Sequence, residues 1–74
     1  MAFKSLGRRF RYQRSSDIGV GGPAYGILQF KFRDSGFLTV GTFHLSWLPE
    51  FISHSADLRA YLKEHTDAVR WARK

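Results

Sequence analysis

The residues best suited to catalysis or metal binding are few in this chain. It contains three histidines, His44, His54 and His65, six acidic residues and no cysteine. Catalytic and zinc sites need such groups at spacings that bring them together in the fold, and no recognised spacing occurs here. The sequence therefore predicts a protein that is not an enzyme, binds no metal or other cofactor and acts on no small-molecule substrate.

Cationic side chains are the more informative group. Twelve lysines and arginines against six acidic residues give a formal net charge of +6 over 74 residues. Such an excess raises the concentration of anions near the protein and speeds its encounter with polyanions. The charge would therefore suit nucleic acid, an acidic protein surface or an anionic membrane surface as the partner, while the apolar runs are too short to span a membrane.

Residues 1–14 hold five of the twelve cations, four of them arginines. Phe10 and Tyr12 alternate with Arg9 and Arg11, which would place rings on one side of an extended segment and guanidiniums on the other. Guanidiniums suit bidentate contact with phosphate or carboxylate. Two interpretations stay open: a basic arm that follows a nucleic-acid backbone, or a first strand that covers the sheet with its rings.

Residues 15–26 form a stretch with four glycines and one proline. A phosphate cradle would need a Gly-Lys-Ser/Thr ending or a helix directly after the glycines, and neither is present. We therefore expect a flexible connecting loop.

Residues 27–45 predict a β-hairpin. Apolar and polar residues alternate before the turn at 34–36, and the alternation continues after it. A three-residue turn with Gly36 at positive φ would pair Phe30 with Val40 and place the two apolar sets on one face.

The opposite face of that hairpin would carry cations beside aromatic rings. Lys31 and Arg33 would lie there with Phe37 and Phe43. Such a face could contact phosphates while a ring stacks on a base. The alternative is that the two rings pack under the N-terminal segment and the cations are ordinary solvated side chains.

Residues 46–74 predict the helical part of the chain. A short helical turn is expected after Ser46, and apolar residues over 56–73 follow the helical repeat. The apolar stripe comprises Leu58, Tyr61, Leu62, His65, Val69 and Ala72. Cations would form a second stripe beside it, made of Arg59, Lys63, Arg70 and Lys74. Trp71 falls off the apolar stripe, either as a contact residue or as the cover of a neighbouring loop.

These elements predict one α+β domain over residues 1–74, with a small antiparallel sheet of two or three strands around a central hairpin, packed against a C-terminal amphipathic helix. The core of such a short chain is small, so a homodimer remains open. The absence of cysteine favours a reducing compartment, and we expect the protein in the cytoplasm.

The function predicted from this pattern is a non-catalytic module that binds nucleic acid, DNA included, through the arm, the hairpin face and the helix stripe. The alternative is a small protein, of the kind that phages encode, that docks on an acidic surface of a larger nucleic-acid-processing enzyme and inhibits or modulates it. The residues expected to contact either partner are Arg8, Arg9, Arg11, Arg14, Lys31, Arg33, Phe37, Arg59, Lys63, Arg70 and Trp71.

Overall fold

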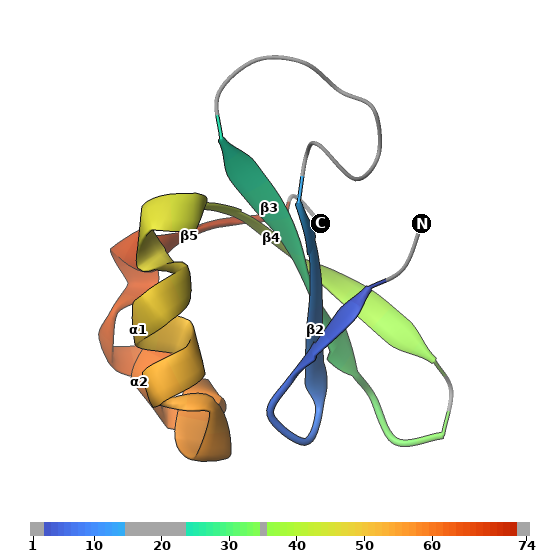
Figure 1. Cartoon of the computed structure of the whole chain (residues 1–74). Helices are drawn as coiled ribbons and strands as arrows, with labels where there is room; N and C mark the ends of the chain where they lie inside the picture. Colours follow the sequence, from blue (N-terminus) through green and yellow to red (C-terminus); the bar gives the residue numbers. More distant parts are fainter. Residues whose placement is uncertain (1–2, 15–23, 35, 73–74) are drawn as a thin grey trace.

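Five strands form a single antiparallel sheet in the order β1-β2-β3-β4-β5 (Figure 1). The computed structural model describes residues 3–14, 24–34 and 36–72, so most of the predicted loop at 15–26 lies outside the described residues, as does Lys74. The strands are β1 (Lys4–Leu6), β2 (Phe10–Arg14), β3 (Tyr25–Lys31), β4 (Phe37–His44) and β5 (Val69–Trp71).

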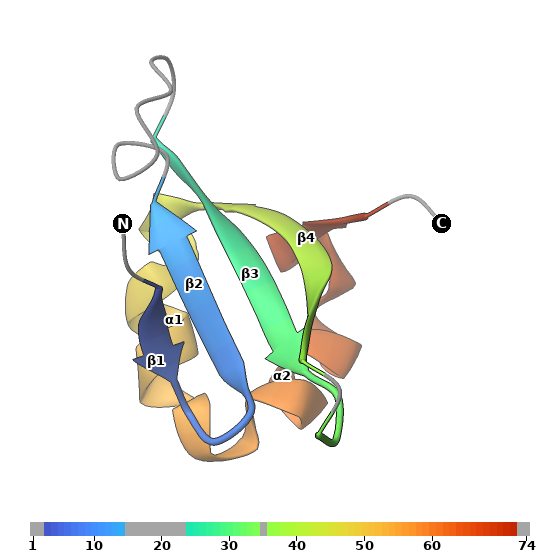
Figure 2. The ribbon, with the colours of Figure 1, turned by 90° about the vertical axis from the view of Figure 1, so that its right-hand side faces the viewer.

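Two short α-helices lie between β4 and β5 in the chain. They are α1 (Leu48–Ser53) and α2 (Leu58–Glu64). Single 3-10 turns link the elements: η2 (Leu45–Trp47), η3 (Ser55–Asp57) and η4 (Thr66–Ala68). Both helices cover one face of the sheet, and Figure 2 shows β1 to β4 in front of them, with β4 curving strongly over the sheet.

The core lies between the helices and the covered face of the sheet. Phe51 of α1 is fully buried and meets Phe43 of β4, with ring centroids 4.9 Å apart. Tyr61 of α2 lies edge-on to Phe51, and Tyr12 of β2 lies edge-on to Phe43. Leu28 is also fully buried between these rings and the helices. Aromatic side chains bury a large apolar area per residue, which allows a short chain to build a core.

The prediction of a two- or three-stranded sheet packed by one C-terminal helix is wrong. The predicted helix over 56–73 ends at Glu64, because His65 leaves the helical region with φ −122° and ψ 62°. Val69 then continues as strand, pairs with Phe43 and is buried. Apolar spacing cannot separate a helix from a short helix followed by a turn and a strand, and here the hydrogen bonds offered by the edge of β4 favour the strand.

The N-terminal segment is a hairpin of two strands and not an extended arm. Gly7 has a positive φ of 78° in the turn between β1 and β2. Phe10 and Tyr12 are buried, and they pair with Phe30 and Leu28 of β3. The alternation of rings and arginines therefore places the rings in the core.

The central hairpin exists as β3 and β4, but its predicted register is wrong. Phe30 pairs with Leu38 and not with Val40, because the connection is longer than three residues and Lys31 already pairs with Phe37. Gly36 has a φ of 104°, the positive value predicted for it. The turn is therefore wider than the sequence pattern suggested.

A β-bulge divides β4 into two halves. The register shifts between Leu28 and Gln29, since these residues pair with Gly41 and Thr39 and leave Val40 without a partner in β3. The extra residue reverses the side on which later side chains lie. Phe43 consequently faces the core, and its predicted position beside Phe37 on the open face is wrong.

A substitution at Phe51 tests the packing of the core. We expect Phe51→Ala to lower the free energy of unfolding by about 3–5 kcal/mol, because it leaves a cavity among the rings. Ile52→Ala is the matched control, since Ile52 is the next residue of α1 and is 55% exposed. Chemical denaturation measures both, and equal losses would contradict this core.

A substitution at Gly41 tests the bulge in β4 and the pairing of β5. A Cβ added at Gly41 would collide with the Arg70 carbonyl oxygen of β5. We therefore expect Gly41→Ala to separate β5 from β4 and to speed hydrogen exchange at the Ala72 amide, which donates to the Val40 carbonyl (2.7 Å). Thr39→Ala, in the same strand, should leave that exchange unchanged. Unaltered exchange in Gly41→Ala would mean that β5 packs differently.

Candidate functional site

Three segments meet at one end of the molecule and surround a basic cavity. They are the β1–β2 turn, the β3–β4 turn and the start of α2, at the lower end of Figure 1. The cavity has a volume of about 540 Å³ and is called the basic compartment here. Its cationic lining residues are Arg8, Arg9, Lys31, Arg33 and Arg59.

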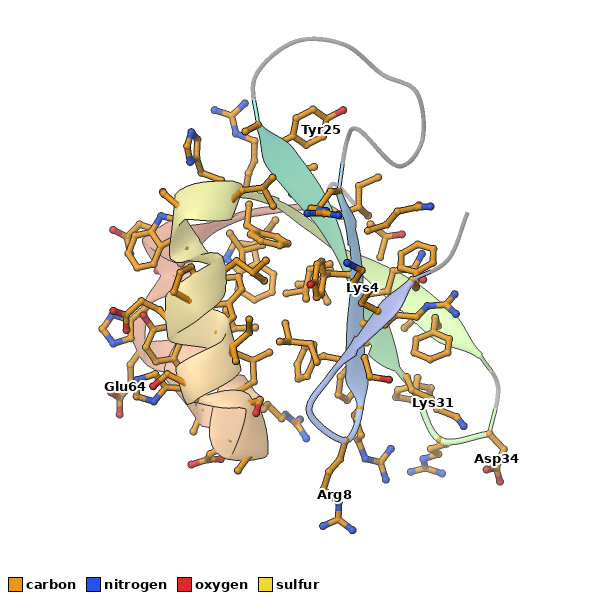
Figure 3. The ribbon with its side chains drawn as sticks, viewed as in Figure 1. Lys4, Arg8, Tyr25, Lys31, Asp34 and Glu64 are labelled. Atoms are coloured by element: carbon orange, nitrogen blue, oxygen red, sulfur yellow. The ribbon has the colours of Figure 1, made fainter. Side chains whose placement is uncertain are left out.

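Backbone pairing holds two of these segments together. The Lys31 amide donates to the Arg9 carbonyl (2.6 Å), and Arg9 Nη1 donates to the Lys31 carbonyl (3.4 Å). Arg33 has a positive φ of 54°, an uncommon value for a residue with a Cβ. Figure 3 shows Arg8 extending away from the β1–β2 turn, with Lys31 and Asp34 on the neighbouring hairpin. Arg8, Arg9 and Arg33 are thus placed by two turns that the sheet holds together.

An apolar cavity of about 680 Å³ adjoins the basic compartment and is called the apolar compartment here. Leu38 and Val40 of β4, Leu62 of α2 and Trp71 of β5 line it. Leu38 is 58% exposed and Trp71 49% exposed, although both are large apolar side chains. Their exposure leaves an apolar surface open at the side of the molecule.

The two compartments adjoin each other and share three lining residues, and together they are called the groove here. The shared residues are Phe10, Phe30 and Arg59. The rings of Phe10 and Phe30 pack with centroids 5.1 Å apart, and the Arg59 guanidinium lies 5.9 Å from the Phe30 centroid. Arg59 therefore stands where the charged part of the groove meets the apolar part.

Three of the five acidic residues that the structure describes, Glu50, Glu64 and Asp67, line neither compartment of the groove. Asp34 and Asp57 are the acidic residues that line the basic compartment. Glu50, Glu64 and Asp57 line a separate cavity with His54 and His65 on the helices, and Figure 3 places Glu64 on the helical side, away from the hairpin turns. The described lining of the groove therefore carries more positive than negative side chains.

Tyr61 is stacked between two histidines on that acidic side. The ring of His54 lies 4.4 Å from it and that of His65 lies 4.3 Å from it. Burial, together with the carboxylates of Glu50 and Asp67, raises the pKa of the Tyr61 phenol above its ordinary value. His65 is exposed at the end of α2 and does not occupy the buried stripe predicted for it.

The structure gathers seven of the eleven predicted contact residues in the groove. Arg8, Arg9, Lys31, Arg33 and Arg59 line the basic compartment; Arg59, Lys63 and Trp71 line the apolar compartment. Arg59 and Lys63 lie four residues apart on α2, so they are neighbours on one helix as predicted. The predicted helical stripe does not continue to Arg70, because that residue lies on β5.

The remaining predicted residues lie outside the groove. Arg70 pairs with Thr42, on the face of the sheet opposite to Trp71. Arg14 is half-buried at the end of β2 and pairs with Gly26. Phe37 lies on the open face, beneath Arg11.

Arg11 is held by contacts within the sheet. Its guanidinium lies 3.6 Å from the Phe37 ring centroid and 4.2 Å from that of Phe3. Its Nε donates to Gln29 Oε1 (2.8 Å), and Gln29 Nε2 donates to Thr39 Oγ1 (3.3 Å). Cation–π contact and hydrogen bonding together make Arg11 part of the sheet's own packing.

Phe30 and Leu38 are groove residues that the sequence pattern placed in the core. Both lie on the helix-facing side of the sheet, but Leu38 is 58% exposed there. An isolated glycine inside a strand is a recognised signal for a bulge, and Gly41 was that signal. It could have indicated that the alternation breaks after Leu38.

Metal and membrane sites have no support in the described part of the chain. Within residues 3–14, 24–34 and 36–72, no three histidine or acidic side chains are grouped so that they could hold a metal ion. In the same ranges, no helix has the length and apolar character needed to cross a bilayer.

Comparisons with family models, with curated proteins and with solved structures found no match to this chain. No relative therefore indicates what the groove binds, and its own residues are the guide to its ligand.

The substitution Arg11→Lys distinguishes the packing contacts of Arg11 from the effect of its charge. The substitution keeps the net charge but removes the planar guanidinium that stacks between two rings and binds Gln29. We expect a loss of roughly 1 kcal/mol in the free energy of unfolding. Lys4→Arg, at an exposed position of β1, is the control. An unchanged melting temperature in Arg11→Lys would contradict a structural role.

Proposed function

We propose that the protein is a non-catalytic module that binds nucleic acid in the groove, with the phosphates in the basic compartment. The observation that carries this proposal is the meeting of five cations from three separate chain segments around one cavity. Four of the five are arginines, whose planar guanidiniums make bidentate contacts with phosphate oxygens.

Electrostatics favours a polyanion in this position. The two aspartates in the lining offset only part of the positive charge, and the remaining acidic residues described on the helices lie elsewhere. A cationic cleft attracts phosphates over several ångströms and releases counterions from the nucleic acid when they bind. We also propose the cytoplasm as the compartment, on the basis of the cysteine-free composition.

A second candidate function is docking on an acidic surface of a larger nucleic-acid-processing enzyme, with inhibition or modulation as the result. One observation favours it: Leu38 and Trp71 are exposed beside the cations. Tryptophan next to a charged rim is a common anchor in protein interfaces. Nucleic acid ranks first because the basic compartment is formed mainly by charges and not by apolar anchors.

Removing two cations of the basic compartment tests the first candidate. We expect Arg8→Ala combined with Arg9→Ala to raise the Kd for an oligonucleotide on the order of tenfold at low salt, and to flatten the log–log salt dependence by roughly one to two units. Fluorescence anisotropy with labelled single-stranded and duplex oligonucleotides measures both quantities.

The matched control is Lys4→Ala combined with Arg70→Ala. It removes the same charge from exposed positions that line neither compartment. Its Kd should rise much less than that of the groove variant. Equal effects of the two pairs would mean that net charge and not the groove determines binding, and no binding by the unaltered protein at low salt would refute the proposed function.

A further inference from the structure

We propose that the apolar compartment receives an unpaired nucleobase from a single-stranded nucleic acid, while the adjoining phosphate lies in the basic compartment. This inference rests on the proposed function and adds the form of nucleic acid that the groove selects. The two compartments adjoin each other at Phe10, Phe30 and Arg59, which line both of them.

The chemistry of the groove changes along its length in the way that a nucleotide unit changes. One part gathers guanidiniums and an ammonium, and the other exposes aliphatic and indole carbon. A nucleotide likewise has a charged phosphate at one end and a flat, weakly polar ring at the other. Arg59 lies between the two parts, where the sugar and its phosphate would pass.

Contacts within the protein hold the Trp71 side chain and backbone in place without a ligand. Its Nε1 donates to the Thr66 carbonyl (3.2 Å), and its backbone pairs with Gly41. Because the indole N–H is already used, the part of the side chain left for a ligand is the ring itself. A held aromatic ring binds a base by stacking at little cost in side-chain entropy.

The apolar compartment is also large enough for a base. Its volume of about 680 Å³ falls in the range of small-molecule sites, and Leu62 lines it from the side of α2. Lys63 lies at its edge, where an ammonium can meet a second phosphate or a polar edge of the base. The aromatic and aliphatic surface of the described lining binds a base by stacking, which is tolerant of base identity.

Duplex nucleic acid cannot use the apolar compartment without base flipping. A paired base is stacked on both faces, and withdrawing it costs a few kcal/mol. A single strand has bases that are free to turn outward. The groove should therefore bind single strands more tightly than duplexes of equal charge.

The decisive experiment compares three ligands with the same number of phosphates. They are a single-stranded oligothymidylate, a single strand of abasic sites of the same length, and an oligothymidylate–oligoadenylate duplex of half that length. We expect the abasic strand to bind about tenfold more weakly than oligothymidylate with a similar salt slope, because it keeps the phosphates and lacks the stacking. The duplex should also bind more weakly than the single strand.

Leu38→Ser tests the compartment itself, and Ile52→Ser is its control at another exposed apolar position. Leu38→Ser should weaken binding of oligothymidylate several-fold and leave the abasic strand unaffected. Ile52→Ser should change neither. Thermal melting of both variants verifies that they are folded, and Trp71→Phe should keep most of the affinity because it keeps an aromatic ring.

The outcomes separate this inference from the proposed function. If oligothymidylate, duplex and abasic strand bind equally well, nucleic-acid binding stands and base insertion is overturned. If none of them binds at low salt, both fail. Tighter binding of a glutamate-rich peptide that contains one phenylalanine than of oligothymidylate would also overturn base insertion, in favour of a protein partner.

Discussion

The β-bulge at Val40 is the constraint on which the rest of this fold depends. Leu38 and Phe43 are five residues apart, so a regular strand would place them on opposite faces of the sheet. The extra residue instead lets Leu38 pair with Phe30 and lets Phe43 enter the core with Phe51. It also bends β4, and Gly41 beside it has no side chain to keep β5 away.

The two halves of β4 have different surroundings. β5 pairs with the second half, from Gly41 to Phe43. Leu38 of the first half and Trp71 of β5 line the apolar compartment together with Leu62 of α2. Leu38 and Trp71 remain 58% and 49% exposed, so this side of the groove is open.

The arginines of this chain divide into two kinds according to their surroundings. Arg11 lies between two rings and is hydrogen-bonded to Gln29, so its guanidinium contributes to the sheet. Arg8 and Arg59 are exposed on the turn and the helix that border the basic compartment. A high content of arginine in one segment is therefore no measure of how many guanidiniums a partner can reach.

The sequence by itself determined the elements whose signals are local. Period-two alternation located the hairpin strands, and the positive φ at Gly36 followed from the freedom of glycine in a turn. The excess of cations and the absence of a catalytic or metal-ligand spacing were also visible in composition alone. All six described cations that line the groove could be named from this information, but not the cavities that they share.

Only the tertiary structure decided the register, the fifth strand and the groove. The apolar spacing of 56–73 suits a helix, yet Val69 gains more by pairing with Phe43 at the open edge of β4. The bulge depends on how β3, β4 and β5 fit together, and no single segment contains that information. Interactions between segments distant in the chain outweigh local propensity at these positions, which is why a pattern read along one segment missed them.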